Sequence, residues 1–189
     1  MHASAILDIP EVRERVQRWS VEEYERFVED GVFQKNSELL RGFVIEKMAK
    51  SPLHFSLSLG IYERLKPLLP NGYTARHEGP LRLADSVPEP DVAIVRGEPG
   101  EFFEKHPTTA ALVIEIAISS AALDRENASL YAEAGVEEYW IVLPRQQQVE
   151  AYRRPTGSSY AERTVYTTEA VLECQSIAGL KIAAARLLG

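Results

Sequence analysis

Apolar residues recur along the chain with two spacings, and these spacings predict its helices and strands. Side chains that repeat every three or four residues predict helices, which we place at residues 20–30, 52–69, 120–134 and 182–188. Short continuous apolar runs predict strands, at residues 73–78, 81–83, 91–95, 111–118, 138–143, 149–153, 160–166 and near 172. Such an order indicates an α/β or α+β fold, a mixed β-sheet flanked by helices that ends in a C-terminal β-meander.

Local signals define several element boundaries. Ser20-Val21-Glu22-Glu23 matches a capping box, and Ser51-Pro52 combines an N-cap serine with proline at the first helical position. Arg41-Gly42 separates two apolar runs and predicts an N-terminal β-hairpin over residues 38–48. Residues 1–19 are expected to form a short helix or arm. The strands at 111–118 and 138–143, joined by a helix, predict a right-handed parallel βαβ unit.

The strand at 111–118 is apolar except for one carboxylate in its middle, Glu115. Period-two geometry places Glu115 on one face with Val113 and Ala117, and the leucine and isoleucines on the other. Removing a lone carboxylate from water costs several kcal/mol, so Glu115 should have a partner, a proton or a metal ion. An ion pair with a buried arginine such as Arg82 is the structural alternative.

A second carboxylate, Asp91, opens the strand at 91–95 directly after Pro90. Two carboxylates about 4 Å apart repel each other by roughly 4 kcal/mol at an effective dielectric constant of 20, and a divalent cation between them reverses this. Oxygen ligands suit hard ions such as Mg²⁺ or Mn²⁺. Asp91 and Glu115 therefore predict a metal site on adjacent strands, although Asp91 could also be a solvated acid at a strand end.

Composition limits the class of protein. A chain of 189 residues that is 45% hydrophobic and 26% charged suits one globular domain, residues 1–189. The single cysteine, Cys174, excludes an internal disulfide framework and fits a reducing compartment. No signal peptide or membrane span is apparent, so we expect a cytoplasmic protein. A net charge of −7 argues against nonspecific coating of nucleic acid.

Several stretches together resemble the PD-(D/E)XK nuclease superfamily, which has the restriction-endonuclease-like fold. More narrowly, the chain resembles the bacterial family described as putative restriction endonucleases. The resemblance covers about residues 20–180 and rests on several stretches: Glu38-Leu39-Leu40-Arg41-Gly42 with Met48, Ser51-Pro52-Leu53-His54, Pro90-Asp91-Val92, Val113-Ile114-Glu115, and residues 124–131 followed by 135–142. It implies an endonuclease, active as a homodimer, that hydrolyses DNA phosphodiester bonds with Mg²⁺ or Mn²⁺ held by Asp91 and Glu115. Glu38 would be a third carboxylate at the metal, or else a surface acid of the hairpin.

One departure from the family pattern concerns its catalytic lysine. The superfamily places lysine two residues after the second acid, where this chain has Ala117. The narrower family places it four residues before the tyrosine that corresponds to Tyr131, where this chain has Asn127. Asn127 and Tyr131 share a helix face, and Asn127 can orient a water but carries no charge. The alternative function is thus a catalytically degenerate nuclease fold that binds nucleic acid or protein.

His54 lies in the first turn of the predicted helix at 52–69. It could contact a phosphate, hydrogen-bond Glu38, or serve a structural role. Tyr131 could support the site from behind the ligands. With these two, the candidate site comprises Glu38, His54, Asp91, Glu115, Asn127 and Tyr131.

Overall fold

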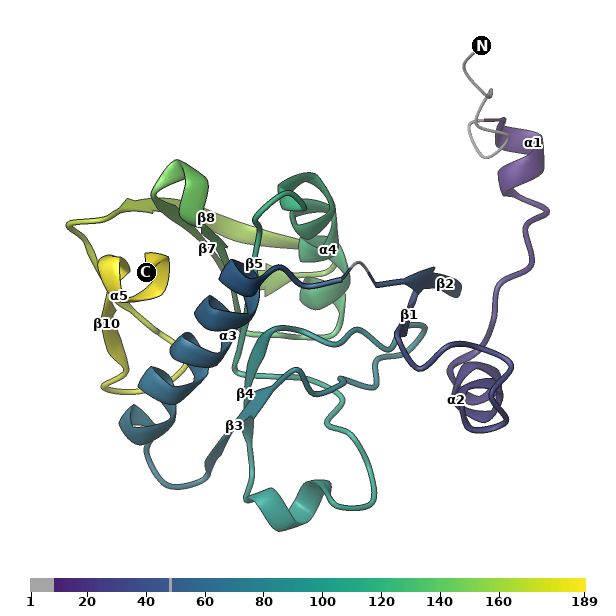
Figure 1. Cartoon of the computed structure of the whole chain (residues 1–189), viewed down its shortest axis with the longest axis horizontal. Coiled ribbons are helices and arrows are strands. Elements are labelled where there is room, and N and C mark those ends of the chain that lie inside the picture. Colours follow the sequence, from purple (N-terminus) through teal and green to yellow (C-terminus); the bar gives the residue numbers. More distant parts are fainter. Residues whose placement is uncertain (1–8, 48) are drawn as a thin grey trace.

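The computed structural model describes residues 9–47 and 49–189. A six-stranded mixed sheet, ordered β3-β4-β5-β6-β7-β8, forms the centre of the molecule (Figure 1). Its strands are β3 (Tyr73–His77), β4 (Val92–Arg96), β5 (Leu112–Ile116), β6 (Glu138–Leu143), β7 (Gln148–Thr156) and β8 (Ser159–Thr167). β5 and β6 run parallel and are connected by α4 (Ala121–Glu133), which confirms the predicted parallel pair; the other neighbours are antiparallel.

Helices cover both faces of this sheet. α3 (Pro52–Leu65) and α5 (Ala184–Leu188) pack on one face, and α4 packs on the other. Alternate residues of β5 enter the two cores: Leu112, Ile114 and Ile116 face α3, whereas Val113 faces α4. The predicted division of this strand into two faces is therefore confirmed, and Glu115 lies on the α4 side by the same alternation.

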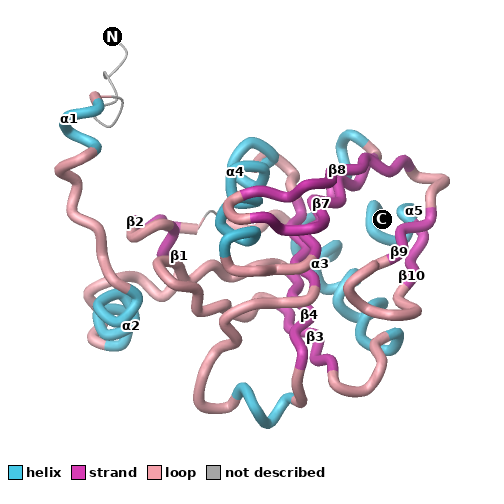
Figure 2. The backbone as a smooth tube through the Cα atoms, turned by 180° about the vertical axis from the view of Figure 1, so that it is seen from behind, coloured by secondary structure: helices cyan, strands magenta, loops and turns pink. Residues whose placement is uncertain are grey.

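A separate hairpin stands beside the main sheet. β1 (Ser37–Leu40) and β2 (Phe43–Glu46) pair antiparallel around Arg41 and Gly42, which both have positive φ angles. α2 (Val21–Glu29) begins at the predicted capping box and packs on this hairpin (Figures 1 and 2). The Val87 amide donates to the Leu39 carbonyl at 2.7 Å and ties β1 to the loop before β4.

The remaining helices are short. α1 (Pro10–Arg13) lies in the predicted N-terminal arm, and three 3₁₀ turns occupy Lys66–Leu68, Pro99–Phe102 and Pro144–Gln146. Residues 1–8 of that arm and Met48, the last residue of the predicted hairpin, lie outside the described residues. Over residues 9–47 and 49–189, every helix is too short or too polar to cross a membrane.

Two predicted strands differ in the structure. Residues 81–83 form an irregular segment, because the amides of Leu81 and Arg82 donate to the carbonyls of Pro88 and Pro107 and join no ladder. The piece near residue 172 does not continue the meander. Instead β9 (Val171–Glu173) pairs with β10 (Lys181–Ala183) in a second small sheet, so the last helix begins at Ala184 and not at residue 182.

Candidate active site

Asp91 and Glu115 are joined through the backbone of two adjacent strands. Val92 of β4 pairs with Ile114 of β5. Because the strands are antiparallel, Asp91, which precedes Val92, lies opposite Glu115, which follows Ile114. The Asp91 amide donates to Glu115 Oε2 at 3.1 Å, and the Ile116 amide donates to Asp91 Oδ2 at 2.9 Å. Each carboxylate is therefore held by the main chain of the neighbouring strand, and the predicted convergence of the two acids is observed.

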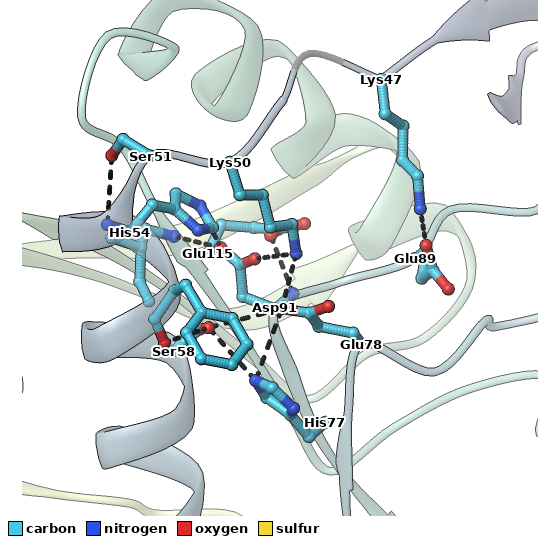
Figure 3. Close-up of polar contacts among 12 residues, drawn as sticks. Lys47, Lys50, Ser51, His54, Ser58, His77, Glu78, Glu89, Asp91 and Glu115 are labelled. Carbon is cyan, nitrogen blue, oxygen red and sulfur yellow. Dashed lines mark hydrogen bonds and ion pairs between the residues drawn. The ribbon is translucent and has the colours of Figure 1, made fainter. Parts of the chain in front are cut away.

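Lys50 and His54 bind the Asp91 carboxylate from the side of α3 (Figure 3). Lys50 Nζ lies 3.0 Å from Asp91 Oδ1, and His54 Nε2 lies 3.1 Å from Oδ2. Burial disfavours the charged form of Asp91, but the hydrogen bond and charge of His54 and the charge of Lys50 outweigh it and lower the pKa of Asp91. His54 thus contacts Asp91, and the predicted hydrogen bond to Glu38 is not formed.

The sequence of the helix start explains how His54 reaches the acid. Ser51 is the N-cap of α3, its Oγ accepts a hydrogen bond from the His54 amide at 3.2 Å, and Pro52 occupies the first turn. His54 is thereby fixed in the first turn of a helix that packs on β4 and β5. Its Nδ1 is buried and has no hydrogen-bond partner among the described residues.

Tyr131 supports Glu115 from α4. The Tyr131 hydroxyl donates to Glu115 Oε1 at 2.8 Å, and the ring is fully buried. Burial, followed by the charges of Asp91, Asp124 and Glu38, raises the pKa of Glu115 well above its usual range. The carboxyl group of Glu115 therefore favours protonation unless a cation compensates the surrounding acids.

Two further acids face the same cavity. Glu38 of β1 accepts a hydrogen bond from the Glu89 amide at 2.7 Å, and burial together with the charge of Asp91 raises its pKa to about 7, against the opposing charge of Lys47. Asp124 of α4 accepts the Ser120 hydroxyl at 2.6 Å, and burial raises its pKa to about 6. Asp124 was not predicted as a site residue, although it opens the stretch 124–131 that contributed to the resemblance.

These side chains line one cavity of about 540 Å³ between β1–β2, the start of α3 and the start of α4. Of the predicted site residues, the lining includes Glu38, His54, Asp91, Glu115 and Asn127. Tyr131 lies behind Glu115 and contacts the cavity residues through its hydroxyl. Arg82 is far from this group and pairs with Glu22 and Glu25 of α2, so an Arg82–Glu115 ion pair is excluded.

Lys50, like Asp124, lines this site and was not predicted as a site residue. It follows β2 and precedes the N-cap of α3, so neither a strand nor a helix repeat marks it. Its ammonium bridges Asp91 Oδ1 and Glu78 Oε1, the latter at 2.9 Å. Burial disfavours its charge, but these two acids outweigh burial and raise the pKa of Lys50. No local pattern in the sequence indicates that Lys50 lies next to Asp91.

The donor set bears on whether the site suits a metal ion. Among the described residues, no group of three or more His, Cys, Asp and Glu side chains is arranged as a ready metal cage. Mg²⁺, however, keeps several waters and binds through one or two carboxylates, which is what Asp91 and Glu115 offer. Burial first, and neighbouring acids in addition, raise the pKa values of Glu115, Glu38 and Asp124, and a cation in the cavity would favour their charged forms. The residues therefore fit a hydrated divalent ion and not an all-protein site.

Comparison with known proteins identifies the family of the chain. A solved structure described as a putative nuclease belonging to DUF820, from Anabaena variabilis, superposes with a TM-score of 0.73 and 19% sequence identity, covering 89% of this chain and 97% of that one. The fold is accordingly restriction-endonuclease-like. The curated proteins contain no match to the chain. The Uma2 family model, described as "Putative restriction endonuclease", matches residues 21–185. Since that match covers almost all of the 189 residues, the chain belongs to the Uma2 family of putative restriction endonucleases.

Proposed function

We propose that the protein is a metal-dependent endonuclease that hydrolyses phosphodiester bonds of DNA in the cavity around Asp91 and Glu115. The observation that carries this proposal is the convergence of these two carboxylates from adjacent strands on one open cavity, with no arginine neutralising them in the described part of the chain. Family membership supports the same class of reaction.

Asp91 and Glu115 would hold Mg²⁺ or Mn²⁺, with Asn127 positioned to orient a water or phosphate oxygen from α4. When bound, such an ion lowers the pKa of a coordinated water and neutralises charge on the phosphate. The remaining roles belong to the chain itself. His54 and the Ile116 amide fix the orientation of Asp91, and Tyr131 fixes that of Glu115. Glu38, whose pKa is raised to about 7, is suited to accept a proton from water near neutral pH or to complete the metal shell.

A duplex that is cut on both strands presents two scissile bonds, so two active sites are needed. We therefore include a homodimer in the proposal. Sedimentation of the protein with and without a short DNA duplex tests this part independently of cleavage.

The proposal is tested by incubating the purified protein with supercoiled plasmid in Mg²⁺ or Mn²⁺, alongside Mn²⁺ titration by calorimetry. Asp91→Asn and Glu115→Gln should each remove nicking and weaken Mn²⁺ binding. Glu162→Gln is the control and should behave as wild type, because Glu162 is a half-buried acid on β8 that pairs with Arg154 and does not line the cavity. Wild-type protein that neither nicks DNA nor binds Mn²⁺ would refute the proposal.

One observation favours the second function, a non-catalytic module that binds nucleic acid or protein. Lys50 already neutralises part of the charge on Asp91, and Asn127 supplies no cation. Under this reading, DNA binding would be unaffected by chelators and by Asp91→Asn, and plasmid would remain supercoiled with every divalent ion. The same two assays therefore separate the two functions.

A further inference from the structure

A single ammonium group lies against the central acid of the cavity. Lys50 Nζ is 3.0 Å from Asp91 Oδ1, and Lys50 lines the cavity with 28% of its side chain exposed. The other lysine in the cavity wall, Lys47, pairs with Glu89 instead. Among the described lysines that line this cavity, Lys50 is thus the one that contacts Asp91.

The position of Lys50 is set by the start of α3. It immediately precedes Ser51, whose side chain caps the helix, and His54 one turn later binds the other oxygen of Asp91. Lys50 and His54 consequently approach the same carboxylate from one helix terminus (Figure 3).

The ammonium group retains donor capacity toward the cavity. It has three N–H donors, and the contacts found in the described structure are to Asp91 Oδ1 and Glu78 Oε1. A third donor is left for an anionic oxygen that enters the cavity. Neither of the positions at which the family pattern would place a lysine, Ala117 and Asn127, carries a positive charge.

We infer that Lys50 is the catalytic cation of this site and that its Nζ binds a non-bridging oxygen of the scissile phosphate beside Asp91. The inference rests on the proposed nuclease function and deepens it, because it assigns the missing positive charge to a different element of the fold. Lys50 forms no covalent bond in this role. It stabilises the charge that builds on the phosphate as water attacks, which is the contribution that a neutral Asn127 cannot make.

The test compares Lys50→Met, Lys50→Arg and the double variant Lys50→Met with Asn127→Lys. The matched control is Lys181→Met, because Lys181 also pairs with a glutamate, Glu173 at 3.1 Å, but lies outside the cavity lining. Four quantities are measured for each: plasmid nicking in Mn²⁺, affinity for a DNA duplex in Ca²⁺ at several salt concentrations, Mn²⁺ affinity, and thermal stability. Lys50→Met should lower the nicking rate by about 10²–10³-fold, the typical loss when one stabilising group is removed. It should also reduce the salt dependence of DNA binding by about one phosphate contact.

Mn²⁺ affinity should be unchanged or tighter in Lys50→Met, because a positive charge next to Asp91 is removed. The double variant should nick plasmid at least tenfold faster than Lys50→Met alone, since Asn127→Lys returns an ammonium group to the cavity from α4. Lys50→Arg should retain part of the activity, and Lys181→Met should match wild type in nicking, DNA affinity and Mn²⁺ affinity.

The outcomes separate the inference from the proposed function. If wild type nicks DNA and Lys50→Met nicks equally well, Lys50 is only a counter-ion of Asp91, and the inference is overturned while the nuclease stands. If wild type is inert but Lys50→Met loses duplex affinity, the nuclease fails and Lys50 remains a phosphate-binding residue. If wild type is inert and both proteins bind duplex equally, both proposals are overturned.

Discussion

The Tyr131 hydroxyl donates a hydrogen bond to Glu115 Oε1 across 2.8 Å, from the helix that connects β5 to β6. Tyr131→Phe removes this donor and leaves one carboxylate oxygen without it. We expect a loss of about 1–2 kcal/mol in the free energy of unfolding, together with weaker Mn²⁺ binding, because Glu115 then favours protonation more strongly. Chemical denaturation and calorimetry measure the two effects.

Tyr152→Phe is the matched control for that change. Tyr152 donates to Glu150 Oε2 at 2.7 Å, the same kind of bond but outside the cavity. It should cost a similar free energy of unfolding and leave Mn²⁺ affinity unchanged. Equal effects of both variants on Mn²⁺ binding would show that Tyr131 has no special connection to the site.

Asn127→Lys in the otherwise wild-type chain tests whether α4 still presents a catalytic position. Asn127 is half-buried in the cavity wall, so a lysine there would add a second ammonium. We expect nicking to increase, but by less than tenfold, because Lys50 already supplies a positive charge at Asp91. An increase far above tenfold would mean that Lys50 does not perform this function.

The raised pKa of Glu38 predicts how stability depends on pH. A carboxyl group whose pKa is about 7 in the folded chain, above its unfolded value, contributes stability that is present below the unfolded pKa and is lost as pH rises through 7. EDTA-treated protein should therefore melt at a higher temperature at pH 5.5 than at pH 8. Asp124, whose pKa is raised to about 6, likewise makes the folded chain more stable at low pH than at high pH.

Glu38→Gln removes the negative charge but keeps a side-chain oxygen that accepts the hydrogen bond from the Glu89 amide. At pH 8 this variant should be more stable than wild type by about 2 kcal/mol, and the difference should disappear near pH 5. Thermal melts of both proteins across this pH range measure it. A variant that is no more stable than wild type at pH 8 would contradict the assigned cause, which is burial of an ionised Glu38.

Glu150 gives the opposite pH dependence and lies outside the cavity. Burial opposes its charge, but Arg125, Arg163 and Tyr152 bind its carboxylate and lower its pKa to about 2. Its contribution is present above the unfolded pKa and is lost as pH falls toward 2. Since the two arginine side chains are 40% and 49% exposed, solvent screens them.

Glu150→Gln should accordingly lower the free energy of unfolding by about 1–2 kcal/mol at pH 7. The difference from wild type should shrink as the pH is lowered from 4 toward 2. Urea denaturation at pH 7, 4 and 3 checks both points. A difference that grows with acidification would rule out the charge-paired form of Glu150.

The parts of the site that were predictable from sequence are those governed by local periodicity. Glu115 interrupts an apolar strand and Asp91 opens another, so alternation alone placed them on elements that proved to be neighbours. The N-cap at Ser51 likewise predicted the helix that carries His54. These features depend on interactions between residues only a few positions apart.

The parts that were missed depend on contacts between distant segments. Lys50 meets Asp91 because a loop after β2 packs on the start of β4, 41 positions later in the chain. Residues 81–83 have a strand-like pattern, yet their amides find carbonyls in two separate loops. The pairing of β9 with β10 similarly links segments across an intervening loop. The spacing of apolar residues along the chain does not indicate which distant segments will contact each other.

The hairpin of β1 and β2 forms its own small sheet and joins the loop before β4 through the Leu39–Val87 bridge and the Glu38 contact with the Glu89 amide. The amides of Arg41 and Gly42 also donate to Ser86 Oγ and the Asp85 carbonyl. One wall of the cavity therefore belongs to a separate two-stranded sheet, whereas Glu115 lies in the central sheet and Asp91 directly precedes its strand β4. Hydrogen exchange at the hairpin amides should be faster than in β4 and β5, since each hairpin strand has one neighbouring strand whereas β4 and β5 each have two. Transplanting another hairpin at residues 37–46 would change the rim of the cavity and leave its floor intact.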